Sequence, residues 1–182
     1  MKFISELYIT EVVSEIDNLA HLAASSPKND LPEPADSQKH AGNYKMGHLS
    51  FQGLPISIEN PKGSYRSGKD KDGKEWKNKI HSHYGYIKNS LGKDGDHVDC
   101  FIGPHHNSDK VFVINQNNPT DGKFDEHKLM MGFHKHSDAV EGYLKNYDSD
   151  WESKGGIGSV HATDIDGLKD WLTNGNQKLP FK

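Results

Sequence analysis

The chain has 182 residues, enough for one catalytic domain with an extension. Its net charge of −4 argues against a general nucleic-acid binder, and no apolar run approaches the roughly 18 residues of a membrane span. A single cysteine, Cys100, fits a reducing compartment, and the first residues make a poor secretory signal, so we expect a cytoplasmic protein.

An amphipathic helix is predicted at residues 3–23, where Ile4, Tyr8, Val12, Ile16 and Leu19 recur at helical spacing. Such a stripe packs on its own domain or on a second subunit, so homo-oligomerisation stays open. The proline-containing stretch that follows breaks both periodicities and indicates a linker. We therefore expect a helix in residues 1–24, a linker in residues 25–41 and a domain in residues 42–182.

The domain begins with strand-like alternation: Leu54, Ile56 and Ile58 alternate with polar positions, which turns Glu59 to the opposite face. A hairpin tip is predicted at residues 69–73. Further strands are expected at 98–102, 111–114, 128–133 and 157–160, and helices at 138–147, capped by Ser137, and 165–172, capped by Thr163 or Asp164. Short strands followed by two helices indicate an α+β fold.

An acidic motif, Asp94-Gly95-Asp96-His97-Val98-Asp99, leads into an apolar strand. In an extended strand the side chains of Asp94 and Asp96 would lie on one face and that of Asp99 on the other, unless a turn at Gly95 changes the direction of the chain. Converging carboxylates repel one another, so a cation is expected between them, and hard oxygen ligands suit Mg²⁺ or Ca²⁺. The alternative is a polar turn that feeds a strand.

Two other metal sites fit the sequence less well. A calcium-binding EF-hand loop that starts at Asp94 would need glycine at its sixth position, where Asp99 stands. The 12 histidines suggest zinc, but the sequence has no HExxH motif and only one cysteine. His97 lies inside the acidic motif and could tune Asp96.

Several segments within residues 52–151 together resemble the soluble Mg²⁺-dependent inorganic pyrophosphatases. They are Tyr84-Gly85-Tyr86-Ile87, the acidic motif, residues 121–129, and Glu59 with Arg66. With the lead-in at residues 42–48, the chain looks closest to the divergent pyrophosphatase-like domains of phage and polyvalent proteins. The resemblance implies a small OB-like five-stranded β-barrel with flanking helices, in a protein encoded by a phage and active in its bacterial host.

The resemblance also implies a ligand set for Mg²⁺, with Mn²⁺ as a substitute, and no organic cofactor. Asp94, Asp99 and Glu126 would ligate the metals that hold the nucleophilic water. Asp121 would join Glu126 at a further metal, and Glu59 would act on another metal through water.

Four further residues would act on the substrate, inorganic pyrophosphate. By the same resemblance, Asp96 would be the general base on the attacking water, and Lys128 and Arg66 would hold phosphate oxygens. Tyr84 would position the substrate, together with a residue of the segment 143–147. Neither a nucleic acid nor a membrane is an expected partner.

The sequence departs from the family pattern at several positions: His97 stands where the family usually has proline or glutamate, and the helical Tyr-Lys pair is not matched in register. Ser57 stands where the family usually has a lysine, and Glu126 stands in place of an aspartate, with Asp125 beside it. The interpretation is metal-dependent hydrolysis of pyrophosphate to two phosphates. The alternatives are a non-catalytic phosphate-binding or metal-binding module of a phage-related protein, and a hydrolase of another, nucleotide-type phosphoanhydride.

Overall fold

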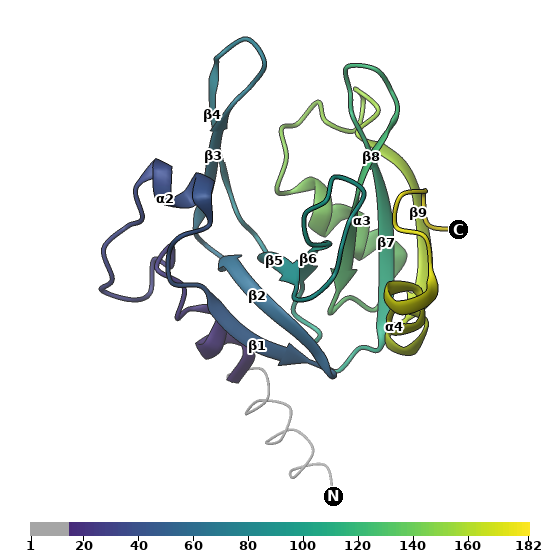
Figure 1. Ribbon diagram of the computed structural model, residues 1–182, viewed down its shortest axis with the longest axis horizontal. Helices are drawn as coiled ribbons and strands as arrows, with labels where there is room; N and C mark the ends of the chain where they lie inside the picture. Colours follow the sequence, from purple (N-terminus) through teal and green to yellow (C-terminus); the bar gives the residue numbers. More distant parts are fainter. Residues whose placement is uncertain (1–14) are drawn as a thin grey trace, which may run out of the picture.

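The structure, a computed structural model, describes residues 15–182 as a mixed α+β fold built on one large sheet (Figure 1). Seven strands hydrogen-bond in the order β1-β2-β5-β6-β8-β7-β9, and β3 and β4 form a separate hairpin. The strands are β1 (Gly47–Phe51), β2 (Leu54–Asn60), β3 (Tyr65–Lys69), β4 (Glu75–Lys79), β5 (His83–Ile87), β6 (Asp99–Ile102), β7 (Lys110–Asn117), β8 (Phe124–Met131) and β9 (Ile157–Asp164). The helices are α2 (Asp36–Ala41), α3 (His136–Leu144) and α4 (Ile165–Asn174).

The α+β class is confirmed, but the predicted closed five-stranded barrel is wrong. In the described part of the chain the sheet has seven strands and is open, with β1 and β9 at its two edges. Strand β8 pairs in parallel with β6 and antiparallel with β7, and β7 carries β9 on its other side. This pairing extends the sheet beyond the fifth strand and holds its two edges apart.

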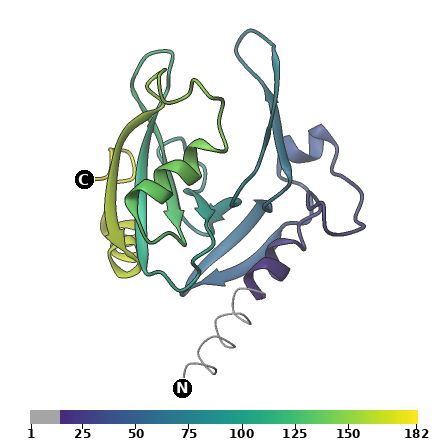
Figure 2. The same ribbon diagram turned by 180° about the vertical axis from the view of Figure 1, so that it is seen from behind.

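Both faces of the sheet are covered, which explains the continuous apolar runs in its central strands. On one face, Ile56, Cys100, Val113 and Leu129 pack in a core that α4 closes with Leu168. On the other face, a core of Tyr84, Phe101, Phe112, Ile114 and Met130 is closed by α3. Figure 2, the view from behind, shows α3 lying across this second face. The prediction that Cys100 is a small core residue is confirmed, since its side chain is fully buried.

The N-terminal segment is part of the first core as far as the structure describes it. Of the predicted helix, residues 1–14 lie outside the described part, and residues 15–20 are helical. Ile16 and Ala20 are buried with the strands, and a Cβ on Gly47 of β1 would lie 2.5 Å from the Leu19 carbonyl oxygen. The expected linker contains helix α2, and the Ser25 hydroxyl donates to the backbone carbonyl of Glu59. The boundaries at residues 24 and 41 stay predictions.

The two predicted helix caps have different outcomes. Asp164 caps α4, and its carboxylate accepts a hydrogen bond from the Gly167 backbone N–H at 2.7 Å. Ser137 does not cap α3, because that helix begins one residue earlier, at His136, with Lys135 at its N-cap. Within residues 15–182, no helix has both the length and the apolar character needed to cross a bilayer.

Candidate active site

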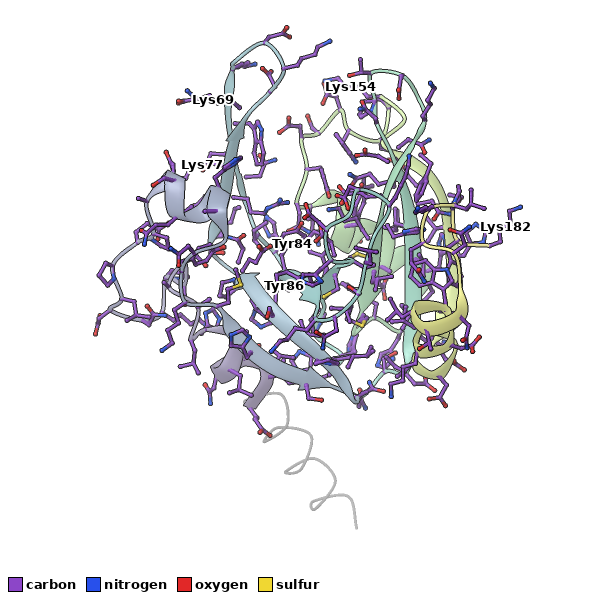
Figure 3. All side chains as sticks on the ribbon, viewed as in Figure 1. Lys69, Lys77, Tyr84, Tyr86, Lys154 and Lys182 are labelled. Atoms are coloured by element: carbon purple, nitrogen blue, oxygen red, sulfur yellow. The ribbon has the colours of Figure 1, made fainter. Side chains whose placement is uncertain are left out.

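The candidate site lies where β5, β6 and β8 run side by side. Asp99 of β6 is in register with Lys128 of β8, and Tyr86 of β5 is in register with Asp99. Because side chains two residues apart share a face, Tyr84 lies on the same side of the sheet as Asp99. Figure 3 shows Tyr84 and Tyr86 between the hairpin and the strands of the second half of the chain.

The glycine between these two tyrosines is required by close packing. A Cβ on Gly85 would lie 1.9 Å from the backbone oxygen of Ser57 on the neighbouring strand β2. Any larger residue would push β5 away from β2. The Tyr-Gly-Tyr sequence therefore brings the two phenol rings beside the strand that carries Glu59.

Lys128 is the centre of a buried charge cluster. Its ammonium is 2.5 Å from Asp99 Oδ2 and 3.0 Å from Glu126 Oε2, with 3% of its side chain exposed. The Tyr84 hydroxyl donates to the same Asp99 oxygen at 2.5 Å. Burial acts to raise the pKa of Asp99, but the Lys128 charge and the two hydrogen bonds hold that pKa below its usual value. The site therefore holds a charged carboxylate, whose side chain is 20% exposed, against a charged ammonium that is almost fully buried.

Glu126, and not its neighbour Asp125, turns into the site. Asp125 is exposed, whereas Glu126 is half-buried and accepts a hydrogen bond from the Gln116 amide at 2.9 Å. Burial raises the pKa of Glu126 despite the nearby ammonium of Lys128. The choice that the sequence left open is thus resolved by the alternation of β8, which puts Glu126 and Lys128 on one face.

A network of polar groups behind Glu126 was missed by the sequence reasoning. The Gln116 side-chain oxygen accepts hydrogen bonds from the hydroxyls of Tyr143, at 2.7 Å, and Tyr147, at 3.0 Å. The Trp151 indole N–H donates to the Tyr143 hydroxyl at 2.8 Å. Gln116 is buried, and the signal that could have found it is an amide pair, Asn115-Gln116, directly after an apolar strand run.

Arg66 and Glu59 form the wall next to the charge cluster. The Arg66 guanidinium lies 4.1 Å from the centroid of the Tyr84 ring. Burial raises the pKa of Glu59, and the negative charge of Asp99 adds to this effect. Ser57, which stands in place of the family's lysine, is buried, and its hydroxyl lies 2.9 Å from His48 Nδ1. Position 57 therefore supplies no cation.

The remaining predicted residues, Asp94, Asp96 and Asp121, are exposed in two loops. Asp94 Oδ1 accepts from the Asp96 backbone N–H, and Asp121 Oδ1 accepts from the Lys123 backbone N–H, each at 3.0 Å. The negative charge of Asp96 still contributes to the raised pKa of Glu59. The structure therefore brings Tyr84, Asp99, Glu126 and Lys128 into contact, with Glu59 and Arg66 beside them, but leaves the loop carboxylates at the rim.

His97 supports the acidic loop. Its ring stacks on Tyr86, with the centroids 4.7 Å apart and an interplanar angle of 12°. Its Nδ1 donates to the backbone oxygen of Ser90 at 2.8 Å. Since an imidazole nitrogen can only donate to a carbonyl, this contact fixes the proton on Nδ1. His97 thus ties the loop to β5.

The chemistry of the donors fits a hard divalent cation, because Glu59, Asp99, Glu126 and the nearby Asp96 offer only carboxylate oxygens. Their spacing is looser than a closed metal site: across residues 15–182, no three acidic, histidine or cysteine side chains are grouped closely enough to hold an ion. Lys128 supplies the positive charge between Asp99 and Glu126 in this structure.

Comparison with known proteins places the chain in a family. The family model described as inorganic pyrophosphatase matches residues 36–173. The chain is similar to the solved structure of an inorganic phosphatase from Anaplasma phagocytophilum, with 15% identity over 68% of this chain and 88% of that one and a TM-score of 0.36. It is also similar to an inorganic pyrophosphatase from Ehrlichia chaffeensis, with 15% identity over 68% of this chain and 90% of that one and a TM-score of 0.34. No curated protein matches the chain. Because the family model covers most of the sequence, including the whole candidate site, the chain belongs to the inorganic pyrophosphatase family.

Proposed function

We propose that this protein hydrolyses inorganic pyrophosphate to two phosphates in a reaction that depends on Mg²⁺, with Mn²⁺ as a substitute. The observation that carries the proposal is the family match, which spans Lys128 and the three residues that its ammonium contacts, Tyr84, Asp99 and Glu126. We also propose that the protein is cytoplasmic and encoded by a phage, as expected from the sequence.

The carboxylates would hold the metal. We assign this role to Glu59, Asp99 and Glu126 inside the site and to Asp94 and Asp121 on the loops. When bound, a divalent cation lowers the pKa of its water and neutralises phosphate charge.

The remaining side chains would act on substrate and water. Arg66 and Lys128 offer N–H donors to phosphate oxygens, and Arg66 can make two parallel hydrogen bonds. Tyr84 orients the Asp99 carboxylate by its short hydrogen bond and carries the Arg66 guanidinium on its ring. Asp96, exposed on the loop, would take the proton of the attacking water.

One observation favours the alternative of a non-catalytic binding module. Lys128 pairs with both Asp99 and Glu126, so two of the proposed metal ligands already have a cationic partner. A site of this kind would bind an anion through Arg66 and Lys128 and would not need to catalyse a reaction.

Phosphate release from pyrophosphate separates the two functions. The purified protein is expected to release phosphate in the presence of Mg²⁺ and to stop when a chelator is added in excess over the metal. Activity that survives chelation would contradict metal dependence. A folded protein that binds pyrophosphate but turns over no phosphoanhydride would be the binding module.

A further inference from the structure

A buried amide lies between the charge cluster and the aromatic residues that follow α3. Gln116 of β7 stands directly opposite Glu126 of β8, and 5% of the residue is exposed. The register of β7 shifts on both sides of this residue, between Asn115 and Gln116 against β9 and between Gln116 and Asn117 against β8. Irregularities of this kind re-aim a side chain and are frequent beside active sites. The strand is therefore built locally around the direction of the Gln116 side chain.

The orientation of this amide follows from its partners. Its Nε2 donates to Glu126 Oε1 at 2.9 Å, and its Oε1 accepts from the hydroxyls of Tyr143 and Tyr147. An ionised carboxylate can accept but cannot donate, so the NH₂ group must face Glu126 and the carbonyl must face the two phenols. Glutamine meets both requirements at once, whereas leucine, which has a similar size, meets neither.

Aromatic packing holds the two phenol hydroxyls in place. The Trp151 indole N–H donates to the Tyr143 oxygen at 2.8 Å, which leaves the proton of Tyr143 for Gln116. The Tyr147 ring centroid lies 4.7 Å from that of Trp151, at an interplanar angle of 19°, and 4.5 Å from that of the fully buried Tyr143. Side chains packed in this way stay in one rotamer. The three rings thus form a rigid support behind the amide.

Held from behind, the Glu126 carboxylate presents its other oxygen to the site. Glu126 Oε2 lies 3.0 Å from the Lys128 ammonium, which in turn lies 2.5 Å from Asp99 Oδ2. Rotation of the carboxylate about its last bond would break the contact with Gln116. The amide therefore keeps Oε2 directed at the place where a positive charge sits between the two acids.

We propose that Gln116 is a positioning residue, which fixes the Glu126 carboxylate so that it can bind a divalent cation. The inference rests on the proposed metal-dependent function, because it concerns the same site. Groups that hydrogen-bond a ligating carboxylate orient it and tune the affinity for the metal. A merely structural amide would contribute to stability alone, whereas a positioning amide also sets the affinity for the metal.

Asn115 offers a matched control on the same strand. It too is a buried amide, but alternation along β7 turns its side chain to the other face of the sheet. There it accepts from the Phe181 backbone N–H at 2.8 Å and donates to the Phe181 backbone oxygen at 2.9 Å. Leucine at either position removes buried hydrogen bonds. Gln116→Leu releases Glu126, whereas Asn115→Leu releases the C-terminal segment.

Binding of Mn²⁺ alone, followed by electron paramagnetic resonance without substrate, tests the proposal. Gln116→Leu should weaken Mn²⁺ binding by about 10- to 100-fold, the usual effect of removing a group that orients a metal ligand. Asn115→Leu should keep the affinity of the original protein. Tyr143→Phe removes one donor to the Gln116 oxygen and should weaken binding by a smaller factor. Circular dichroism establishes which variants fold, and Tyr143→Phe decides the test if Gln116→Leu does not.

Unchanged Mn²⁺ affinity in the folded Gln116 or Tyr143 variant would overturn the inference, as would an equal loss in Asn115→Leu. Phosphate release from pyrophosphate separates it from the proposed function. Turnover with a metal affinity that does not depend on Gln116 leaves the proposed function and removes the positioning role. Metal binding that depends on Gln116 without turnover of any phosphoanhydride supports the positioning role and removes the hydrolase. An original protein that binds no Mn²⁺ would contradict both.

Discussion

At the scale of single residues, the site divides into a buried floor and an exposed rim. Asp99, Glu126 and Lys128 form the floor and are held by short contacts, whereas Asp94, Asp96 and Asp121 stand on loops in water. A buried ion pair fixes geometry at a cost in desolvation, and a loop carboxylate can move a proton at little cost. Substitutions of floor residues and of rim residues should therefore impair different properties of the protein.

Replacing Asp96 by asparagine should affect catalysis and leave metal binding nearly intact. Asparagine keeps the size of the side chain but cannot accept a proton, so turnover should fall by on the order of 10²–10⁴. Asp99→Asn should instead weaken the response to Mg²⁺. Steady-state rates at increasing Mg²⁺ concentration measure both effects. Rescue of Asp96→Asn by high Mg²⁺ would mean that Asp96 is a ligand and not the base.

Lys128→Met should destabilise the folded protein strongly. The change leaves the partly buried carboxylates of Asp99 and Glu126 without their ammonium, a defect that costs up to about 3–5 kcal/mol. Urea unfolding at neutral pH measures the loss, with Lys123→Met, an exposed lysine of the neighbouring loop, as the control. An equal effect of both variants would show that the buried pair contributes nothing special to stability.

His127 predicts a pH dependence of stability. Burial lowers the pKa of this histidine from 6.5 to about 4, and its buried Nδ1 has no hydrogen-bond partner among residues 15–182. Between these values the unfolded chain binds a proton that the folded chain refuses, so stability is complete above pH 6.5 and falls as the pH drops towards 4.

The test compares urea unfolding at pH 7 and pH 5. His127→Phe should lose less stability than the original protein over this interval, by on the order of 2 kcal/mol, since each pH unit corresponds to about 1.4 kcal/mol per proton. His40→Phe, at an exposed position of α2, should follow the original protein. If His127→Phe does the same, the histidine does not resist protonation.

At the scale of elements, alternation and capping patterns predicted most strands and helices because both signals are local. The strands near residues 54–58, 98–102, 111–114 and 157–160, and the helix after Asp164, follow from such signals. The start of β8 at Phe124 did not follow, because its first residues are polar and gain their strand conformation from pairing with β7. Ser137 resembled a cap, but α3 begins one residue earlier, at His136.

The two helix starts provide a direct comparison. Asp164→Ala removes an acceptor for the Gly167 N–H and should lower the free energy of unfolding by about 1 kcal/mol, within a range of 0.5–2. Ser137→Ala removes no cap and should change stability by less than about 0.5 kcal/mol. Both values come from chemical denaturation. Equal costs would contradict the assignment of the caps.

At the scale of the whole molecule, the sequence could not predict which strands become neighbours. The pattern of β2, β6 and β8 defines faces, but the parallel contact of β6 with β8 joins segments far apart in the chain. The family resemblance suggested a closed barrel, but the strands pair as an open sheet in which β7 and β9 follow β8. The contact of Asp99 with Lys128 depends on the pairing of β6 with β8, so the sequence alone could not predict the geometry of that contact.

The N-terminal segment from residue 15 should behave as part of the core that α4 closes. Ile16 is 7% exposed among the strands, so Ile16→Ala should cost about 2–5 kcal/mol of unfolding free energy. Leu22, close by in the chain, is 46% exposed, and Leu22→Ala should cost less than about 0.5 kcal/mol. Thermal and urea unfolding measure both. A small effect of Ile16→Ala would indicate that the segment is separable from the domain.

The parallel seam between β6 and β8 has a consequence for how the protein assembles. Strands β1, β2, β5 and β6 connect by antiparallel pairing within the first part of the chain, and β7, β8 and β9 do so within the second. Asp99 belongs to one half and Lys128 to the other. Neither half carries the charge cluster alone, and non-local pairing is slow to form. The site should therefore form only after the two halves have paired, and a bound ligand would stabilise that pairing.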